Sequence, residues 1–288
     1  MRFYCFERDG SSHLGVSSSG GKQVLDLTAV APELPKDPIE FVTGFASTQS
    51  IVRQIIQSKQ GPNWTYDLDS LQLLAPIPRP GKILCSGINY RSHFQENPDA
   101  VLPEEPFFFA KVPSTVVGPS QPIICPRLSQ QVDYEIELAV VIGKTMKEAA
   151  ESEVLEHIFG YTILNDVSAR DVQLRNSQIT LGKNFDAFCP IGPCIATRDE
   201  IPHPDRISLK TFLNGQLMQE GSTADWLFGL PQLLSFLSQR ITLEPGDVVS
   251  TGTPAGVGVF RKPPIFLKPG DIVRLEADPI GVLQNNVI

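Results

Sequence analysis

The stretch Val132-Asp-Tyr-Glu-Ile-Glu-Leu-Ala-Val-Val-Ile142 is an apolar run with an acid at three alternating positions, Asp133, Glu135 and Glu137. Alternate residues of an extended strand point to the same side, so the three carboxylates are predicted to share one face. The opposite face is apolar throughout, and the acidic face itself continues into Ala139 and Val141. The run therefore predicts a strand that is buried on both sides rather than one with a solvated face.

Carboxylates crowded on a buried face repel one another, and burying them without partners is costly. A hard divalent cation removes that conflict, so the pattern predicts a metal site, with an acidic edge strand facing water as the alternative. Asp166 is the next candidate ligand, because it falls where the apolar strand 159–165 ends and a short helix begins. Its alternative role is to cap that helix. Ligands that are all oxygen favour Mg²⁺, Mn²⁺ or Ca²⁺ over zinc.

A histidine and a glutamate, His93 and Glu96, stand three residues apart in the segment Gly87–Pro98. The two side chains share a face if this segment is helical, and Pro98 permits only a short helix. Such a segment suits a lid that carries a histidine base oriented by a carboxylate. A surface pair without function is the alternative.

The glycine-rich loop Thr251–Gly258 follows an apolar strand. It lacks the Gly-Lys-Ser/Thr ending of a phosphate loop and the spacing of a dinucleotide-binding motif, which argues against a nucleotide-binding enzyme. Its backbone amides are candidates for holding a substrate carboxylate, and a plain tight turn is the alternative. Lys183, in Leu181-Gly-Lys-Asn-Phe-Asp186, is weak evidence of function by itself.

The composition is that of an ordinary globular protein, with 288 residues, 41% hydrophobic and 19% charged. The net charge of -8 and the absence of a Lys/Arg block argue against nucleic acid or a membrane surface as partners. The apolar runs are too short to span a membrane. Five scattered cysteines are expected to be buried free thiols in a reducing compartment. The cytoplasm is the expected location, or the mitochondrial matrix if a transit peptide precedes this sequence.

Short strand candidates separated by turns dominate the sequence, which has 25 prolines and 22 glycines. No regular alternation of strands and helices is visible, so we predict an α+β fold that is predominantly β. A hairpin is expected over residues 1 to about 30, around Asp9-Gly10. The proline-rich stretch 75–81 is interpreted as a linker between a small amino-terminal domain (1–75) and a larger domain (76–288). Helices are expected at 47–59, 147–158, 167–175 and 227–239.

Five segments together resemble the fumarylacetoacetate hydrolase family, in the family's order, over about residues 76–288. They are Gly87–His93, Asp133–Gly143, Asn165–Asp171, Gly182–Pro193 and Glu244–Gly258. In addition, Val259-Phe-Arg-Lys-Pro-Pro264 is similar to the mitochondrial fumarylacetoacetate hydrolase domain-containing proteins and their bacterial relatives. The first 75 residues are similar only in general character.

The resemblance implies a mixed β-roll or β-sandwich of the family's carboxy-terminal type, a small β-rich amino-terminal domain and a homodimer. It implies a Mg²⁺ or Mn²⁺ site, with Ca²⁺ as an alternative occupant in a crystal. The implied metal ligands are Glu135, Glu137 and Asp166, with Asp133 beside them. The implied catalytic residues are His93, Glu96 and Lys183, and the implied substrate contacts are Arg170, Gln173 and Thr253. One departure is Ile179, where relatives often carry Trp, and it leaves the distal substrate pocket undefined.

The activity implied is that of an enzyme acting on small 2-oxo or 2,4-dioxo acids through a metal-bound enolate. A carbon–carbon bond hydrolase of the acylpyruvate or fumarylacetoacetate type is the first expectation. The alternative is an oxaloacetate keto–enol tautomerase or decarboxylase that uses the same site. A third hypothesis, from another class, is a non-catalytic binding module whose cation only stabilises the fold.

Overall fold

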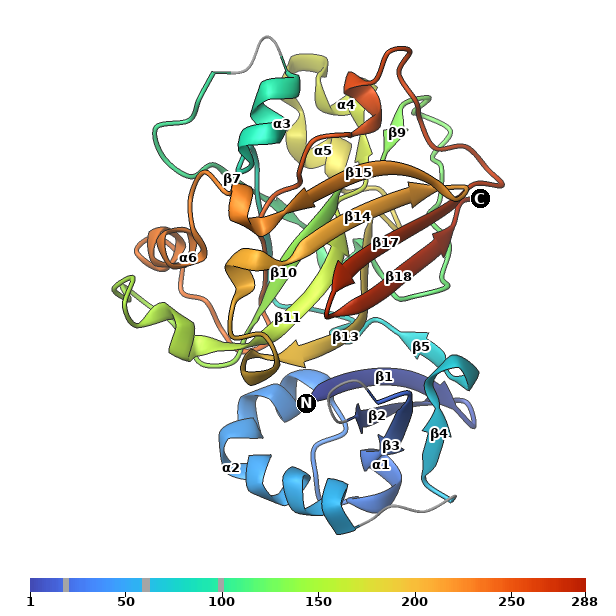
Figure 1. The fold of residues 1–288 in the computed structure, drawn as a ribbon, viewed down its shortest axis with the longest axis vertical. Helices are drawn as coiled ribbons and strands as arrows, with labels where there is room; N and C mark the ends of the chain where they lie inside the picture. Colours follow the sequence, from blue (N-terminus) through green and yellow to red (C-terminus); the bar gives the residue numbers. More distant parts are fainter. Residues whose placement is uncertain (18–20, 59–62, 98–100) are drawn as a thin grey trace.

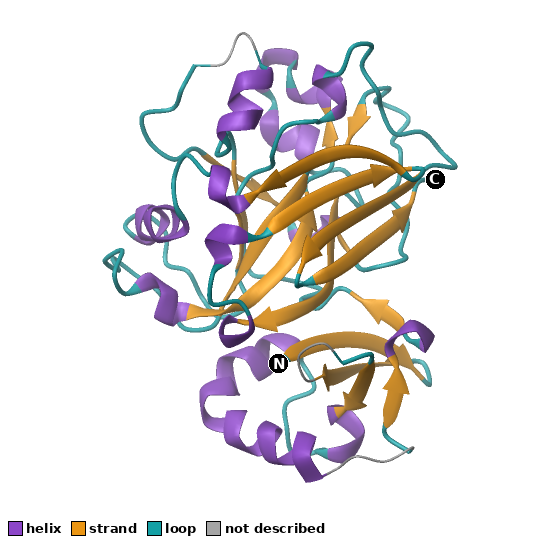
Figure 2. Ribbon diagram, viewed as in Figure 1, coloured by secondary structure: helices purple, strands orange, loops and turns teal. Residues whose placement is uncertain are grey.

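The computed structural model describes residues 1–17, 21–58, 63–97 and 101–288. The amino-terminal segment lies below a larger body of strands, and the short helices of residues 91–96, 170–173 and 179–183 lie at the top of that body (Figures 1 and 2). None of the described helices is both long and apolar enough to cross a membrane. The five cysteines have free thiols, and all but Cys125 are fully buried.

The amino-terminal segment contributes five strands and two α-helices among its described residues. Its strands are β1 (Arg2–Arg8), β2 (Ser11–Ser17), β3 (Gln23–Asp26), β4 (Thr65–Asp67) and β5 (Gln72–Leu74), and its helices are α1 (Leu27–Val30) and α2 (Pro38–Ser58). The antiparallel pairing of β1 with β2 confirms the hairpin expected around Asp9-Gly10.

Helix α2 begins nine residues before the helix predicted at 47–59, because a strong start signal precedes it. The Asp37 carboxylate accepts hydrogen bonds from the backbone N–H groups of Ile39 and Glu40, and Pro38 occupies the first helical position. The predicted carboxy-terminal residue, Lys59, lies outside the described residues.

A large sheet of 12 strands runs through the whole molecule in the order β4-β3-β2-β1-β13-β11-β10-β16-β6-β7, with β5 beside β1 and β8 beside β13. Its remaining strands are β6 (Ile83–Ser86), β7 (Phe108–Lys111), β8 (Val116–Val117), β10 (Ile136–Ile142), β11 (Ile158–Asn165), β13 (Cys189–Thr197) and β16 (Val248–Ser250). The amino-terminal segment joins this sheet through β1, whose Phe3 is paired with Ile195 of β13. The proposed boundary near residue 75 stays a prediction.

A second sheet of four strands packs against the first in the order β15-β14-β17-β18. Its strands are β14 (Ser208–Leu213), β15 (Gln216–Ser222), β17 (Ile272–Asp278) and β18 (Gly281–Asn286), and they cross in front of β10 and β11 in Figure 1. A two-stranded pair, β9 (Val132–Asp133) with β12 (Ser168–Ala169), lies near the upper end. These layers confirm the predicted mixed β fold.

The alternation predicted for the opening stretch holds within β10. Ile136, Leu138 and Val140 belong to the main core, which includes side chains of the four-stranded sheet, such as Leu275. Ala139 belongs to a separate buried cluster on the other face. Strand β10 is therefore buried on both sides, as the sequence predicts, and the acidic face is not solvated.

The remaining helices are short: α3 (Arg91–Glu96), α4 (Arg170–Gln173), α5 (Ile179–Lys183) and α6 (Leu230–Ser238). Helix α6 confirms the prediction at 227–239, and α4 is shorter than the predicted 167–175. The predicted helix 147–158 is wrong, because only a 3₁₀ turn at Val154–His157 forms. The backbone N–H groups of Glu148 and Ala149 bond to Ser238 instead of to a helix of their own.

Candidate metal centre and active site

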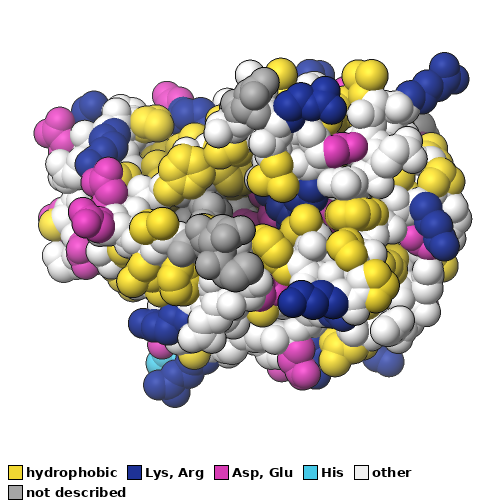
Figure 3. Space-filling model, turned by 90° about the horizontal axis from the view of Figure 1, so that it is seen from above, with side chains coloured by type: hydrophobic (Ala, Val, Ile, Leu, Met, Phe, Trp, Pro, Cys, Tyr) yellow, Lys and Arg dark blue, Asp and Glu magenta, His cyan; other side chains and the backbone are white. Residues whose placement is uncertain are grey.

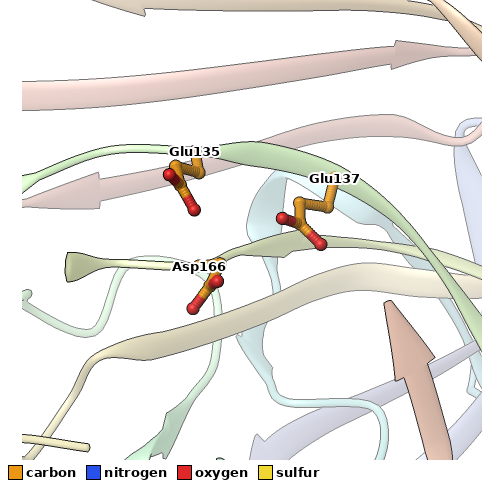
Figure 4. Close-up of side chains that lie close together, drawn as sticks. All are labelled: Glu135, Glu137 and Asp166. Carbon is orange, nitrogen blue, oxygen red and sulfur yellow. The ribbon is translucent and has the colours of Figure 1, made fainter. Parts of the chain in front are cut away.

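Three carboxylates converge at the upper end of the large sheet, and their ligand oxygens lie within 4.8 Å of one another. Glu137 lies in β10, Glu135 directly precedes that strand, and Asp166 directly follows β11 (Figure 4). Pairing of Ile136 with Asn165 brings the two strand ends together, and the Asp166 N–H donates to the Glu135 carbonyl at 2.9 Å. All three side chains are buried.

Asp133, the first acid of the opening stretch, does not belong to this triad. Its carboxylate accepts hydrogen bonds from the backbone N–H groups of Gly258 (2.7 Å) and Val259 (3.0 Å) and from Arg170 Nε (2.9 Å). The chain leaves the strand between β9 and β10, so the strict alternation of 132–142 is interrupted at Tyr134 and Glu135. Asp133 therefore anchors the glycine-rich loop and the guanidinium.

Arg170 and Lys183 neutralise part of the acidic cluster. Arg170 Nη2 lies 2.5 Å from Glu135 Oε1, and Lys183 Nζ lies 2.6 Å from both Glu135 Oε2 and Asp166 Oδ2. Burial by itself would raise the pKa of Glu135, but these two cations override it and hold the pKa well below the usual range. The pKa of Lys183 is raised, because the two carboxylates outweigh its burial.

Glu137 has a different environment from Glu135. It accepts hydrogen bonds from the Ser250 hydroxyl and from the Gly252 N–H at 3.0 Å, and it forms no ion pair with any described residue. Burial, together with the neighbouring carboxylates of Asp166 and Glu135, raises its pKa well above the ordinary value. The cluster therefore lacks positive charge on the side of Glu137.

The predicted dyad forms within α3. His93 Nδ1 lies 2.7 Å from Glu96 Oε1, and Glu96 Oε2 accepts a hydrogen bond from the Gly256 N–H at 2.8 Å. A carboxylate oxygen accepts, so His93 Nδ1–H is the donor in this contact, and Nε2 is the ring nitrogen that does not face Glu96. Glu96 thus orients the imidazole and ties α3 to the glycine-rich loop.

These side chains surround a cavity of about 220 Å³. Every predicted site residue except Glu96 lines it, namely His93, Glu135, Glu137, Asp166, Arg170, Gln173, Lys183 and Thr253. The other walls are mostly apolar and include Ile88, Phe107, Phe109 and Ile179. Viewed from above, the surface is hollowed, and charged side chains lie inside the hollow among hydrophobic ones (Figure 3). The structure thus brings the predicted residues together around one cavity. Ile179, the position at which this sequence departs from its relatives, lines the same cavity.

Lys111 and Ser250 contact the triad but were not predicted. Lys111 Nζ lies 2.7 Å from Asp166 Oδ1, and the Ser250 hydroxyl bonds to Glu137. The available signal for Lys111 was a lone cation at the end of the apolar strand Phe107-Phe-Phe-Ala-Lys111. A buried strand rarely carries a lysine without a partner, so this position was a candidate for an ion pair. Nothing in the local sequence distinguishes Ser250.

The donor set fits a hard divalent ion. Three carboxylates present oxygen ligands within a small space. Ionised Glu137 is repelled by the carboxylates of Asp166 and Glu135, and a cation bound beside it would offset that repulsion. A structural salt-bridge network alone does not explain Glu137, which has no cationic partner among the described residues.

Comparisons with known proteins identify relatives of this chain. The chain is 45% identical to the mitochondrial oxaloacetate tautomerase FAHD2B of Bos taurus over 278 residues, which cover 96% of the chain and 87% of that relative. A fumarylacetoacetate hydrolase from psychrophilic Exiguobacterium antarcticum is 38% identical, with a TM-score of 0.85 and coverage of 100% of this chain and 99% of that one.

A maleylpyruvate hydrolase from Sphingobium sp. SYK-6, solved in complex with manganese(II) and pyruvate, is 29% identical with a TM-score of 0.82. The alignment covers 100% of this chain and 99% of that one. Residues 82–288 match the family of fumarylacetoacetate (FAA) hydrolase carboxy-terminal domains. The chain belongs to the fumarylacetoacetate hydrolase family, close to its mitochondrial domain-containing members.

Proposed function

We propose that this protein is a divalent-metal-dependent oxaloacetate keto–enol tautomerase. The observation that carries the proposal is one small cavity in which the carboxylates of Glu135, Glu137 and Asp166 converge and which His93 also lines. The identity of 45% to an oxaloacetate tautomerase supports this reaction over the carbon–carbon bond hydrolysis that the sequence favoured. Mg²⁺ or Mn²⁺ is the proposed ion, and the maleylpyruvate hydrolase that holds manganese supports that choice.

A divalent ion held by Glu135, Glu137 and Asp166 would act as a Lewis acid on a bound 2-oxo acid and make the proton on the adjacent carbon more acidic. The protein's own groups are arranged to move that proton. His93 Nε2 is the base that takes it from the carbon or returns it, while Glu96 holds the imidazole in the required tautomer. The Lys183 ammonium stabilises negative charge on the substrate oxygen.

Carbon–carbon bond hydrolysis is the second candidate, favoured by the His93–Glu96 dyad. An oriented imidazole can activate a water molecule as well as move a carbon-bound proton. The maleylpyruvate hydrolase that shares this fold supports the option. Both reactions, and decarboxylation, would use the acidic triad in the same way. Assays with different substrates are therefore needed to distinguish them.

A direct assay separates the three reactions. The purified protein with Mg²⁺ is mixed with the enol form of oxaloacetate, and the ultraviolet absorbance of the enol is followed while pyruvate is measured in parallel. Faster loss of enol without pyruvate is the expected result. Acetylpyruvate is the second substrate, and its cleavage would identify a hydrolase. An enol decay equal to that without protein would reject the tautomerase.

Replacing His93 with alanine is expected to lower the tautomerase rate by about a hundredfold to ten-thousandfold, the usual contribution of an oriented base. Metal binding is expected to persist, because His93 is not one of the three converging carboxylate ligands. The rate is measured by enol decay and ion binding by calorimetry. His157→Ala is the matched control, because His157 is half-buried, does not line the cavity, and its ring Nδ1 bonds to the Thr145 carbonyl. Wild-type turnover by the His93 variant would remove this residue from the mechanism.

The homodimer and the compartment stay predictions. Similar oxaloacetate tautomerases from Bos taurus and Homo sapiens are named mitochondrial, which is consistent with the matrix as the alternative location.

A further inference from the structure

Lys111, the last residue of β7, is a fully buried lysine that the proposed reaction does not use. Its ammonium nitrogen lies 2.7 Å from Asp166 Oδ1, 2.6 Å from the Lys183 carbonyl oxygen and 3.2 Å from the Val167 carbonyl oxygen. An ammonium has three N–H donors, and here each has an acceptor. Burying a charge without such partners would be costly, so this contact set indicates a built site rather than a chance packing.

Lys111 and Lys183 contact opposite oxygens of the same carboxylate. Lys111 takes Oδ1 of Asp166, whereas Lys183 takes Oδ2. Lys183 lines the cavity, and Lys111 is not among the described residues that do. Lys111, which does not line the cavity, therefore holds Asp166 by Oδ1, while Oδ2 pairs with Lys183, which does line it.

The same lysine fixes the position of α5. Lys111 donates a hydrogen bond to the Lys183 carbonyl. Two further hydrogen bonds join the end of β7 to Asn184, the residue after Lys183. The Val112 N–H donates to Asn184 Oδ1 at 2.5 Å, and Asn184 Nδ2 donates to the Ala110 carbonyl at 3.0 Å. The end of β7 thus holds both Asp166 and the backbone of the active-site lysine.

We propose that Lys111 is a positioning residue that makes Asp166 a ligand through one oxygen and thereby favours Mg²⁺ over Ca²⁺. The inference rests on the metal site of the proposed function. Mg²⁺ requires near-ideal octahedral geometry with short bonds, whereas Ca²⁺ accepts six to eight oxygens and carboxylates that bind through both oxygens. The Lys111 ammonium occupies the Oδ1 side of Asp166, so an ion that binds both oxygens has to displace this ammonium or share Oδ1 with it. Without Lys111, Oδ1 loses its cationic partner while Lys183 still pairs with Oδ2, and binding of an ion through both oxygens becomes easier.

The test measures the dissociation constants of Mg²⁺ and Ca²⁺ by calorimetry on the metal-free full chain, for wild type and Lys111→Met. Loss of one positive charge near the site strengthens the binding of both ions equally, because both carry two charges. The ratio Kd(Mg)/Kd(Ca) therefore reports the change in ligand geometry separately from the change in charge. It is expected to rise about tenfold in Lys111→Met, the low end of effects for groups that orient metal ligands.

Lys82→Met is the matched control. Lys82 also pairs with two carboxylates, at 2.7 Å from Glu244 and 2.8 Å from Asp247, but neither carboxylate belongs to the triad. Its ratio is expected to equal that of wild type. An unchanged ratio in Lys111→Met, or an equal shift in Lys82→Met, would overturn the proposal.

A second variant covers the case in which Lys111→Met does not fold. Lys111→Gln keeps a donor but is one bond shorter, so it cannot reach all three acceptors, and a rise in the ratio of at least about threefold is expected. An unchanged ratio there also rejects the positioning role. If wild type binds ions but does not accelerate enol decay, the tautomerase fails while the ratio still decides the role of Lys111. If wild type binds neither ion, both proposals fail.

Discussion

Replacing Glu137 with glutamine is expected to abolish divalent-ion binding and to lower the tautomerase rate by about a thousandfold or more, because a bound ion supplies several kcal/mol of stabilisation to the reacting oxygen. Glu137 is the triad member without a cationic partner among the described residues, so its charge is balanced least by the protein. Its loss removes both a ligand oxygen and the local excess of negative charge.

The same substitution is expected to stabilise the metal-free protein. Burial and the carboxylates of Asp166 and Glu135 raise the pKa of Glu137, so its ionised form is disfavoured in the folded state. A glutamine carbonyl still accepts from the Ser250 hydroxyl and the Gly252 N–H, without the charge. We therefore expect the free energy of unfolding of the metal-free protein to be higher in the Glu137→Gln variant than in wild type at neutral pH.

Ion binding is measured by calorimetry, and stability by chemical denaturation in the presence of a chelator. Glu220→Gln is the matched control, because Glu220 lies on the surface of β15 and pairs only with Lys210 at 2.9 Å. It is expected to leave ion binding unchanged. Wild-type affinity for Mg²⁺ in the Glu137 variant, or a lower stability of its metal-free form, would contradict the assignment of Glu137 as a ligand under charge repulsion.

Replacing Gly258 with alanine is expected to lower the free energy of unfolding by about 3 kcal/mol or more, the upper range for overpacked sites. An added Cβ would lie 1.9 Å from the Ile265 carbonyl oxygen and 2.6 Å from Asp133 Oδ1. The Ile265 oxygen belongs to the backbone, so moving it away costs more free energy than rotating a side chain. Activity should fall as well, because the Gly258 N–H and Arg170 are bound to the same Asp133 carboxylate.

Gly44→Ala is the control for this experiment. Gly44 lies inside α2, and nothing lies within 4 Å of the position of an added Cβ. Alanine is the better helix former, so a gain of up to about 1 kcal/mol is expected. Denaturant unfolding of both variants is compared with that of wild type. Equal stability of the Gly258 variant and wild type would show that the loop relaxes around the added methyl group.

The strand at the centre of the fold was predictable because its signal is local. The alternation in 132–142 predicts two buried faces, and β10 has them. The interruption between β9 and β10 was not predictable, because it depends on long-range contacts. One of them is the bond from the Glu135 N–H to Asn165 Oδ1, 30 residues away.

The helix expected at 147–158 shows the limit of periodicity. Its apolar residues have helical spacing, but the chain takes its hydrogen-bond partners from Ser238 and adopts a positive φ of 51° at Glu148. Tertiary contacts outweigh a weak helical preference. Nothing within the segment indicates that the end of α6 packs beside it.

The site was predictable in its residues more than in its connections. The resemblance supplied the residues that now surround one cavity, and their roles stay predictions. It did not supply Lys111, which lies 55 residues before its partner Asp166. An ion pair between distant segments leaves no periodic trace in one sequence, so only the folded chain reveals it.

The pairing of β1 with β13 has a consequence for how the protein can be divided. Because Arg2 and Phe3 pair with Ala196 and Ile195 of β13, we expect the first strand to unfold together with the part of the large sheet that carries the carboxylate triad. Removing the amino-terminal segment would leave the backbone N–H and C=O groups of β13 that face β1 without hydrogen-bond partners. Such an uncovered strand edge is a template for aggregation, so a shortened chain would have to protect it by other means.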